Sequence, residues 1–209
     1  MPIPAGVIGD GPFLAGLRQL CDEHGLLLPD QVEGIALHEI GHLSGLGHSA
    51  LGETESAASG GRRVLAADSV MFPIAFSIGS IAGRALTADD IAGISDLYPD
   101  NGFNEDTGSA SGRVTKNGQG VLGAHVVAFD PATGDMVGNF SLDAQGQFSI
   151  AGLRPGPKVL RVEPLDDAEV TSFFDGPVDL AFVQKFFERL IVVPRGGDSG
   201  AVELRVAPK

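Results

Sequence analysis

The chain has 209 residues, of which 43% are hydrophobic and 20% charged, so a packed core is expected and a disordered polypeptide is excluded. The formal net charge of −13 argues against a nucleic-acid partner, because phosphate binding requires clustered Lys and Arg. Cys21 is the single cysteine, which excludes both a disulfide framework and a thiolate metal cluster.

Two helices are predicted near the start of the chain. The first covers residues 12–24, where apolar side chains recur at helical spacing before Gly25. The second begins after Pro29, carries an apolar stripe along one side, and ends at Gly45 and Gly47. The stripe consists of Val32, Ile35, Ala36, Ile40 and Leu43. Residues 49–70 are rich in Gly, Ser, Ala and Glu, and we expect them to form a loop.

A third helix is predicted from Thr87 to about Tyr98. Asp90 lies three residues after Thr87, which is the spacing of a capping box, and Pro99 follows the helix. The next residues, PDNGFNEDTGSASG, are polar and turn-forming, so they indicate a linker. The acidic stretch DNGFNED could bind Ca²⁺, but it lacks the full spacing of a calcium loop, and a solvated linker is the favoured interpretation.

Beyond this linker the sequence consists of short apolar runs separated by turn signals such as NGQG, DPATGD and RPGP. Regular spacing of this kind is typical of an all-β sandwich. The expected strands are 113–115, 121–129, 136–142, 147–150, 158–162, 189–193 and 201–206. Residues 178–188 are predicted to form a short helix between two of them. His125, like His24, is a lone histidine for which a structural role is expected.

The segment HEIGHLSGLGH, which begins at His38, carries the chemistry. On a helix His38 and His42 are one turn apart on the same face, so both imidazoles can reach one ion. His48 can join them only if the chain turns sharply, and Gly45 permits the left-handed backbone that such a turn needs. Three neutral imidazoles leave the fourth position of a tetrahedral zinc ion open for water. Glu39 lies beside the first ligand, where its carboxylate can take the proton of that water.

This segment, followed by Ser49, closely resembles the metzincins, and specifically the matrixins. SVMFP is similar to the Met-turn of that family, which implies that Met71 forms an apolar floor beneath the histidines. LTADDIAGISDLYP resembles the closing helix of matrixin catalytic domains. The resemblance spans roughly residues 30–99 and implies an exported zinc endopeptidase that acts on proteins or peptides.

The second half has a likeness of its own. A resemblance to carboxypeptidase regulatory-like domains, which are small transthyretin-like sandwiches, is carried by the segments SGRVTKNGQGVLGAHVVAFD and DAQGQFSIAGLRPGPKVLRV. This resemblance implies a role in stability or attachment rather than in catalysis. The expected fold class is therefore α+β in two domains. Residues 1–99 form the zinc-binding portion of a peptidase, residues 100–111 a linker, and residues 112–209 an all-β Greek-key sandwich.

In matrixins a sheet precedes the zinc helix and holds the substrate as an added strand. Only 37 residues precede His38, too few for that sheet, and they contain no signal peptide. We therefore expect a truncated or drastically trimmed catalytic domain, secreted by family resemblance, with weak proteolysis. Two alternatives stay open: a zinc-binding protein without catalytic competence, and a non-enzymatic adhesion or scaffold module. No apolar stretch is long enough to span a membrane, and oligomeric state is not predicted.

Overall fold

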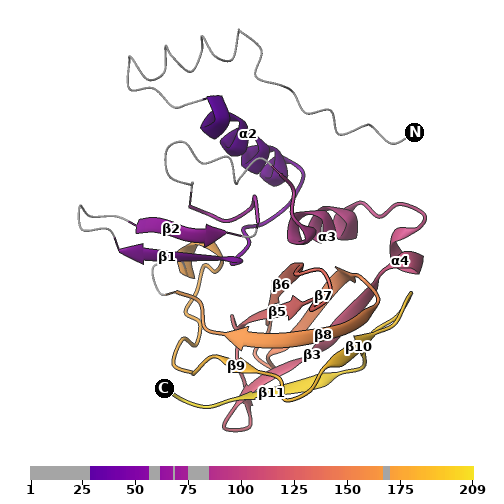
Figure 1. Cartoon of the computed structure of the whole chain (residues 1–209). Coiled ribbons are helices and arrows are strands. Elements are labelled where there is room, and N and C mark those ends of the chain that lie inside the picture. Colours follow the sequence, from indigo (N-terminus) through magenta and orange to yellow (C-terminus); the bar gives the residue numbers. More distant parts are fainter. Residues whose placement is uncertain (1–28, 57–61, 68, 75–84, 167–169) are drawn as a thin grey trace.

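The computed structural model describes residues 29–56, 62–67, 69–74, 85–166 and 170–209 (Figure 1). The helix expected at 12–24, with Cys21, and the lone His24 lie outside these residues. Figure 1 shows helix α2 at the top, helix α3 in the middle, and a stack of strands below them. No helix in the described part of the chain is long and apolar enough to cross a bilayer.

Two of the predicted helices are confirmed. Helix α2 covers Pro29–Leu43, and helix α3 covers Ala88–Leu97 with Thr87 as its N-cap. The Asp90 carboxylate accepts hydrogen bonds from both the backbone N–H and the hydroxyl of Thr87, each at 2.8 Å. This contact confirms that the spacing of Thr87 and Asp90 marks the start of a helix. A four-residue helix, α4, and a 3-10 turn, η2, complete the helical elements that are described, and they cover Phe103–Asp106 and Val170–Ser172.

The described strands form one hairpin and two larger sheets. The hairpin pairs β1 with β2 in antiparallel orientation. One sheet has the order β10-β8-β5-β6 with β9 also paired to β8, and the other has the order β11-β3-β4 with β7 also paired to β3. All of these pairs are antiparallel except β11 with β3, which is parallel. The strands are β1 Gly52–Ser56, β2 Arg62–Ala67, β3 Gly108–Lys116, β4 Gln119–Gly120, β5 His125–Phe129, β6 Met136–Phe140, β7 Gln147–Leu153, β8 Gly156–Glu163, β9 Lys185–Phe186, β10 Ile191–Val193 and β11 Val202–Val206.

The core of the protein lies between the two larger sheets. Burial alternates along β8, as expected for a strand with one face toward a core and one toward solvent. The buried cluster contains Val114 of β3, Val126 of β5, Ile150 of β7 and Leu160 of β8. Ala92 of helix α3 belongs to the same cluster, so this helix is packed directly on the sandwich and holds the upper part of the molecule against it.

The expectation of an α+β fold is wrong. Among the described residues strands dominate, with few and short helices, and this composition fits an all-β fold better. One cause of this error is that residues 49–70 were expected to be a loop but contain the hairpin β1–β2. Cross-strand backbone pairing satisfies N–H and C=O groups regardless of residue type, so a weak β-propensity did not prevent strand formation.

Two further local expectations differ from the structure. Residues 178–188 contain no helix: Phe182 is fully buried and bridges to Pro208, and β9 extends the sheet beside β8. Extended pairing with the sandwich therefore prevails over the helical pattern. The stretch 100–111, expected to be linker, includes α4 and the first residues of β3, which begins at Gly108.

The apolar stripe of α2 is largely exposed. The exposed fraction is 51% for Val32, 55% for Ile40 and 87% for Leu43. The opposite side of the helix faces the rest of the molecule, and it carries the histidines described next.

Candidate metal centre

Three histidines come together where helix α2 ends. His38 and His42, one turn apart, have ring centroids 4.7 Å apart. The chain then reverses at Gly45, whose φ is +96°, with hydrogen bonds from Leu46 N–H to the Gly41 carbonyl (3.0 Å) and from Gly45 N–H to the His42 carbonyl (2.9 Å). This pair of bonds is the Schellman motif of a glycine-terminated helix. The expected role of Gly45 is therefore observed in the backbone.

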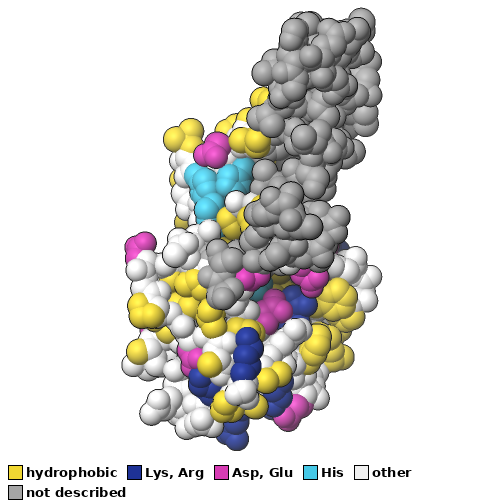
Figure 2. Space-filling view, turned by 90° about the vertical axis from the view of Figure 1, so that its left-hand side faces the viewer, with side chains coloured by type: hydrophobic (Ala, Val, Ile, Leu, Met, Phe, Trp, Pro, Cys, Tyr) yellow, Lys and Arg dark blue, Asp and Glu magenta, His cyan; other side chains and the backbone are white. Residues whose placement is uncertain are grey.

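The reversal returns His48 to the helix face. Its ring centroid lies 5.3 Å from that of His38 and 4.7 Å from that of His42. One nitrogen of each ring can be chosen so that all three lie within 4.8 Å of one another. Figure 2 shows histidine side chains gathered on an exposed face in the upper part of the molecule, beside acidic and hydrophobic side chains.

Each of the three imidazoles is oriented by a backbone carbonyl. The Nδ1 atoms of His38, His42 and His48 lie 2.8, 2.9 and 3.0 Å from the carbonyl oxygens of Val70, Leu46 and Ser172. A carbonyl oxygen can only accept, so in each neutral ring the proton resides on Nδ1 and the lone pair on Nε2. This arrangement is the usual orientation of metal-binding histidines, whose second nitrogen donates to a fixed acceptor.

The free nitrogens are close enough to share an ion. His42 Nε2 and His48 Nε2 are 3.1 Å apart, and two lone pairs at this distance repel unless a cation lies between them. Two nitrogens bound at about 2.0–2.1 Å to a tetrahedral ion lie roughly 3.3 Å apart, close to the observed spacing. Burial, reinforced by the neighbouring His42 and His38, lowers the pKa of His48, although the hydrogen bond to Ser172 opposes this. The lowered pKa favours the neutral ring that a metal requires.

Glu39 and Met71, the other residues expected at this site, lie near the histidines. Glu39 is exposed on α2 beside His38, and its charge acts on the ring of His48. Met71 is only 3% exposed and lies against helix α2 between His38 and His42, since a Cβ added to Gly41 would be 2.3 Å from its Sδ atom. The Met71 carbonyl also accepts a hydrogen bond from Ser49 N–H at 2.9 Å, which holds the residue after His48.

Asp90 fixes the loop beneath the histidines, a role that its position as a helix cap did not indicate. Its side chain is 2% exposed and accepts hydrogen bonds from Ser69 Oγ (2.7 Å), Val70 N–H (3.0 Å) and Met71 N–H (3.2 Å), as well as from Thr87. Because the Val70 carbonyl orients His38, this carboxylate indirectly fixes the position of the His38 ring. In the sequence, the spacing of Thr87 and Asp90 indicated only the start of a helix, and it gave no sign that Asp90 also binds this loop.

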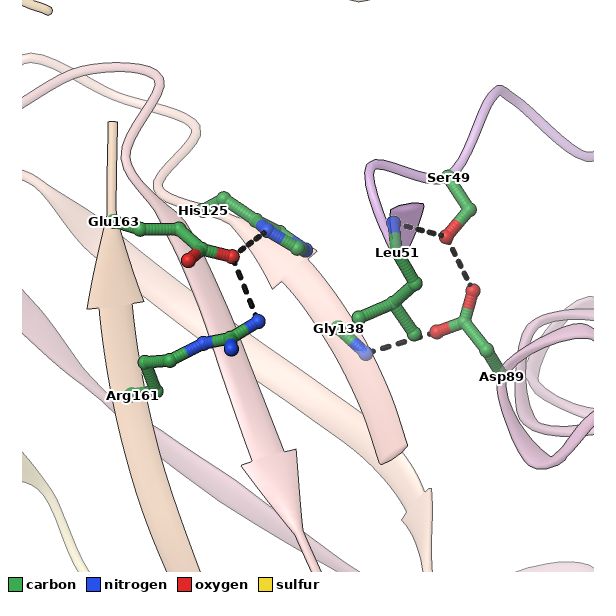
Figure 3. A network of polar contacts seen from close by, with 7 residues as sticks. All are labelled: Ser49, Leu51, Asp89, His125, Gly138, Arg161 and Glu163. Carbon is green, nitrogen blue, oxygen red and sulfur yellow. Dashed lines mark hydrogen bonds and ion pairs between the residues drawn. The ribbon is translucent and has the colours of Figure 1, made fainter. Parts of the chain in front are cut away.

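A second polar network joins the histidine loop to the sandwich (Figure 3). Asp89 accepts hydrogen bonds from the Ser49 hydroxyl at 2.6 Å and from Gly138 N–H of β6 at 2.8 Å. Burial raises the pKa of Asp89, although both hydrogen bonds oppose the rise. This carboxyl therefore links the residue after His48, helix α3 and the sheet.

His125 takes part in the neighbouring ion pair shown in the same view. Its Nδ1 lies 3.1 Å from Glu163 Oε1, to which Arg161 also donates at 2.9 Å (Figure 3). Burial opposes ionisation of Glu163, but the hydrogen bonds and positive charge of these two partners outweigh it and lower its pKa. The structural role expected for His125 is thus what its contacts indicate.

Comparisons with known proteins add little to this picture. No family model matches the chain, and no curated protein does. Among solved structures the chain is similar to "The Bacillus anthracis TIE protein", with 16% sequence identity and a TM-score of 0.31. The match covers 49% of this chain and 17% of that one, and at this TM-score it bears on neither fold nor function.

Proposed function

We propose that this chain is a zinc-dependent endopeptidase in which His38, His42 and His48 bind the ion and Glu39 is the general base. The observation that carries the proposal is the arrangement of the three rings, each with Nδ1 near a backbone carbonyl and with one nitrogen of each ring within 4.8 Å of the others. Imidazole is a preferred ligand of zinc, and three protein ligands are typical of a catalytic zinc site.

His38, His42 and His48 would hold the zinc ion, which would supply a Lewis acid for the substrate carbonyl and would lower the pKa of water toward about 7. The residues of the chain account for the rest of the chemistry. The Glu39 carboxylate takes a proton from the attacking water and later transfers it to the departing amine. Its exposed position keeps it available to both. Met71 is buried against Gly41, which lies between His38 and His42 on the same helix. Val70, Leu46 and Ser172 keep the ligand rings from rotating out of place.

Two measurements on the full chain test the proposal. Metal analysis of the purified protein should give one zinc per chain, and His42→Ala should abolish binding because it removes a ligand from the centre of the cluster. Unchanged zinc content in this variant would contradict the ligand assignment. Lowering the pH should also release the ion, because each ring must be neutral to bind it.

Turnover separates an enzyme from a protein that only binds metal. Glu39→Gln keeps the size of the side chain and should retain zinc, but hydrolysis of an unstructured protein substrate should fall by about 10²–10⁴-fold. Glu53→Gln, which changes an exposed carboxylate in β1, is the matched control and should cleave like the parent. A parent chain that binds zinc and cleaves nothing would favour the catalytically incompetent alternative.

A further inference from the structure

The third histidine is held by the sandwich and not by the part of the chain that carries the other ligands. The acceptor for His48 Nδ1 is the carbonyl of Ser172, 124 residues further along the chain, in the turn η2 that follows β8. In Figure 1 this turn belongs to the orange part of the chain. By contrast, the acceptors for His38 and His42 both precede the sandwich.

The turn is closed by its own backbone. Phe173 N–H and Phe174 N–H both donate to the Val170 carbonyl, at 3.0 and 2.9 Å. With that carbonyl satisfied inside the turn, the Ser172 carbonyl is left directed at His48.

Aromatic rings connect this turn to both the histidines and the sheet. The Phe173 ring meets the His48 ring edge to face, with centroids 6.2 Å apart. Phe140, at the end of β6, lies 5.1 Å from Phe173 and 5.5 Å from Phe174. The Phe140 ring in turn contacts the ring of His125 in a tilted arrangement, with centroids 5.4 Å apart, and His125 is 2% exposed. Ring contacts therefore run without interruption from the buried sheet to the third ligand.

We propose that the turn Val170–Phe174 is a part of the metal centre, in which Ser172 fixes the ring of His48 and Phe173 with Phe140 fixes Ser172. The sandwich then determines metal affinity, rather than serving only for stability or attachment. This inference rests on the proposed metal site. Phe173 and Phe140 are positioning residues in this scheme, because they act on the ion only through His48.

Zinc affinity of the full chain, measured by competition with a chromophoric chelator, tests the proposal. Removing a group that orients a ligand typically weakens metal binding by about 10–100-fold, and we expect a loss of that size for Phe173→Ala. Phe173→Tyr keeps the ring and should restore an affinity close to that of the parent. Phe186→Ala, which removes an exposed ring of β9, is the control and should leave affinity unchanged.

A second readout distinguishes positioning from simple loss of folding. Nitrogen NMR shifts of the histidine rings in the metal-free protein should show His48 with its proton on Nδ1 in the parent, and a mixture of tautomers in Phe173→Ala. The Phe174 ring contacts Phe140 but not His48, so Phe174→Ala should lower the zinc affinity less than Phe173→Ala does.

Two results would overturn the inference: parent-like zinc affinity in Phe173→Ala, or an unchanged His48 tautomer in that variant. Failure of the proposed function has a different signature, since the parent chain would not bind zinc or His42→Ala would bind it normally.

Discussion

Replacing Asp90 by alanine should destabilise the fold and weaken metal binding together. The variant leaves the backbone N–H groups of Val70 and Thr87 without the carboxylate that accepts them, whereas Met71 N–H keeps Ser69 Oγ as an acceptor. Each buried donor left unsatisfied costs about 1–3 kcal/mol, so even the lower figure for two donors lowers the free energy of unfolding by about 2 kcal/mol. The two hydroxyls that also donate to Asp90 can rotate toward other acceptors, and they add little to this sum.

Asp90→Asn should cost much less. The amide introduced by this substitution can place its NH₂ group where Oδ1 of Asp90 lies. There it can donate to Ser69 Oγ, because the hydroxyl of Ser69 can rotate to accept. Met71 N–H loses this acceptor but keeps Ser69 Oγ at 3.1 Å. We therefore expect a loss of about 1 kcal/mol, the net value of one hydrogen bond.

Urea unfolding of the metal-free protein measures these values, and chelator competition measures the zinc affinity. Because Asp90 holds the loop whose Val70 carbonyl orients His38, Asp90→Ala should also weaken zinc binding, by about 10–100-fold. Asp96→Ala, an exposed carboxylate on the same helix, is the control and should change neither quantity. A destabilisation by Asp90→Ala no larger than about 1 kcal/mol would refute the reasoning, because two orphaned donors cannot cost so little.

Three further outcomes are expected. Gly41→Ala places a Cβ 2.3 Å from Met71 Sδ and should weaken zinc binding, although alanine favours a helix over glycine by about 1 kcal/mol. Gly47 has open space around it, so Gly47→Ala should bind zinc like the parent. Equal zinc affinities of the two variants would refute the packing argument. Gly45→Ala forces a side chain into φ +96° and should lower the free energy of unfolding by about 1–2 kcal/mol in urea titrations, whereas a neutral result would mean that the turn does not need this conformation. Burial raises the pKa of Asp89, so the Asp89 carboxyl group keeps its proton to a higher pH in the folded state than in the unfolded chain. The stability contributed by this protonated carboxyl group is lost as the pH rises through the raised pKa. Asp89→Asn has no carboxyl group to ionise at this position, so its stability relative to the metal-free parent should increase from about pH 4 to about pH 7. A decrease would mean that the folded state favours the ionised carboxylate of Asp89.

The sequence by itself determined the features that depend on neighbours along the chain. His38 and His42 share a face because residues four apart do so on any helix, and the reversal at Gly45 follows from the backbone freedom of glycine. The start of α3 was likewise readable from Thr87 and Asp90. In each case a local rule applies over fewer than about two helical turns, and tertiary contacts did not oppose it.

Only the tertiary structure decided the rest. The hairpin β1–β2 and strand β9 arise where backbone groups find partners across space, and those partners overrode weak or contrary propensities, so the expected fold class was wrong. Asp90 gained three donors from a loop about twenty residues away, and His48 gained its acceptor from a turn 124 residues away. A backbone carbonyl such as that of Ser172 is chemically the same at every position, so no residue pattern can mark it. Its direction is fixed by the folding of the whole chain around it.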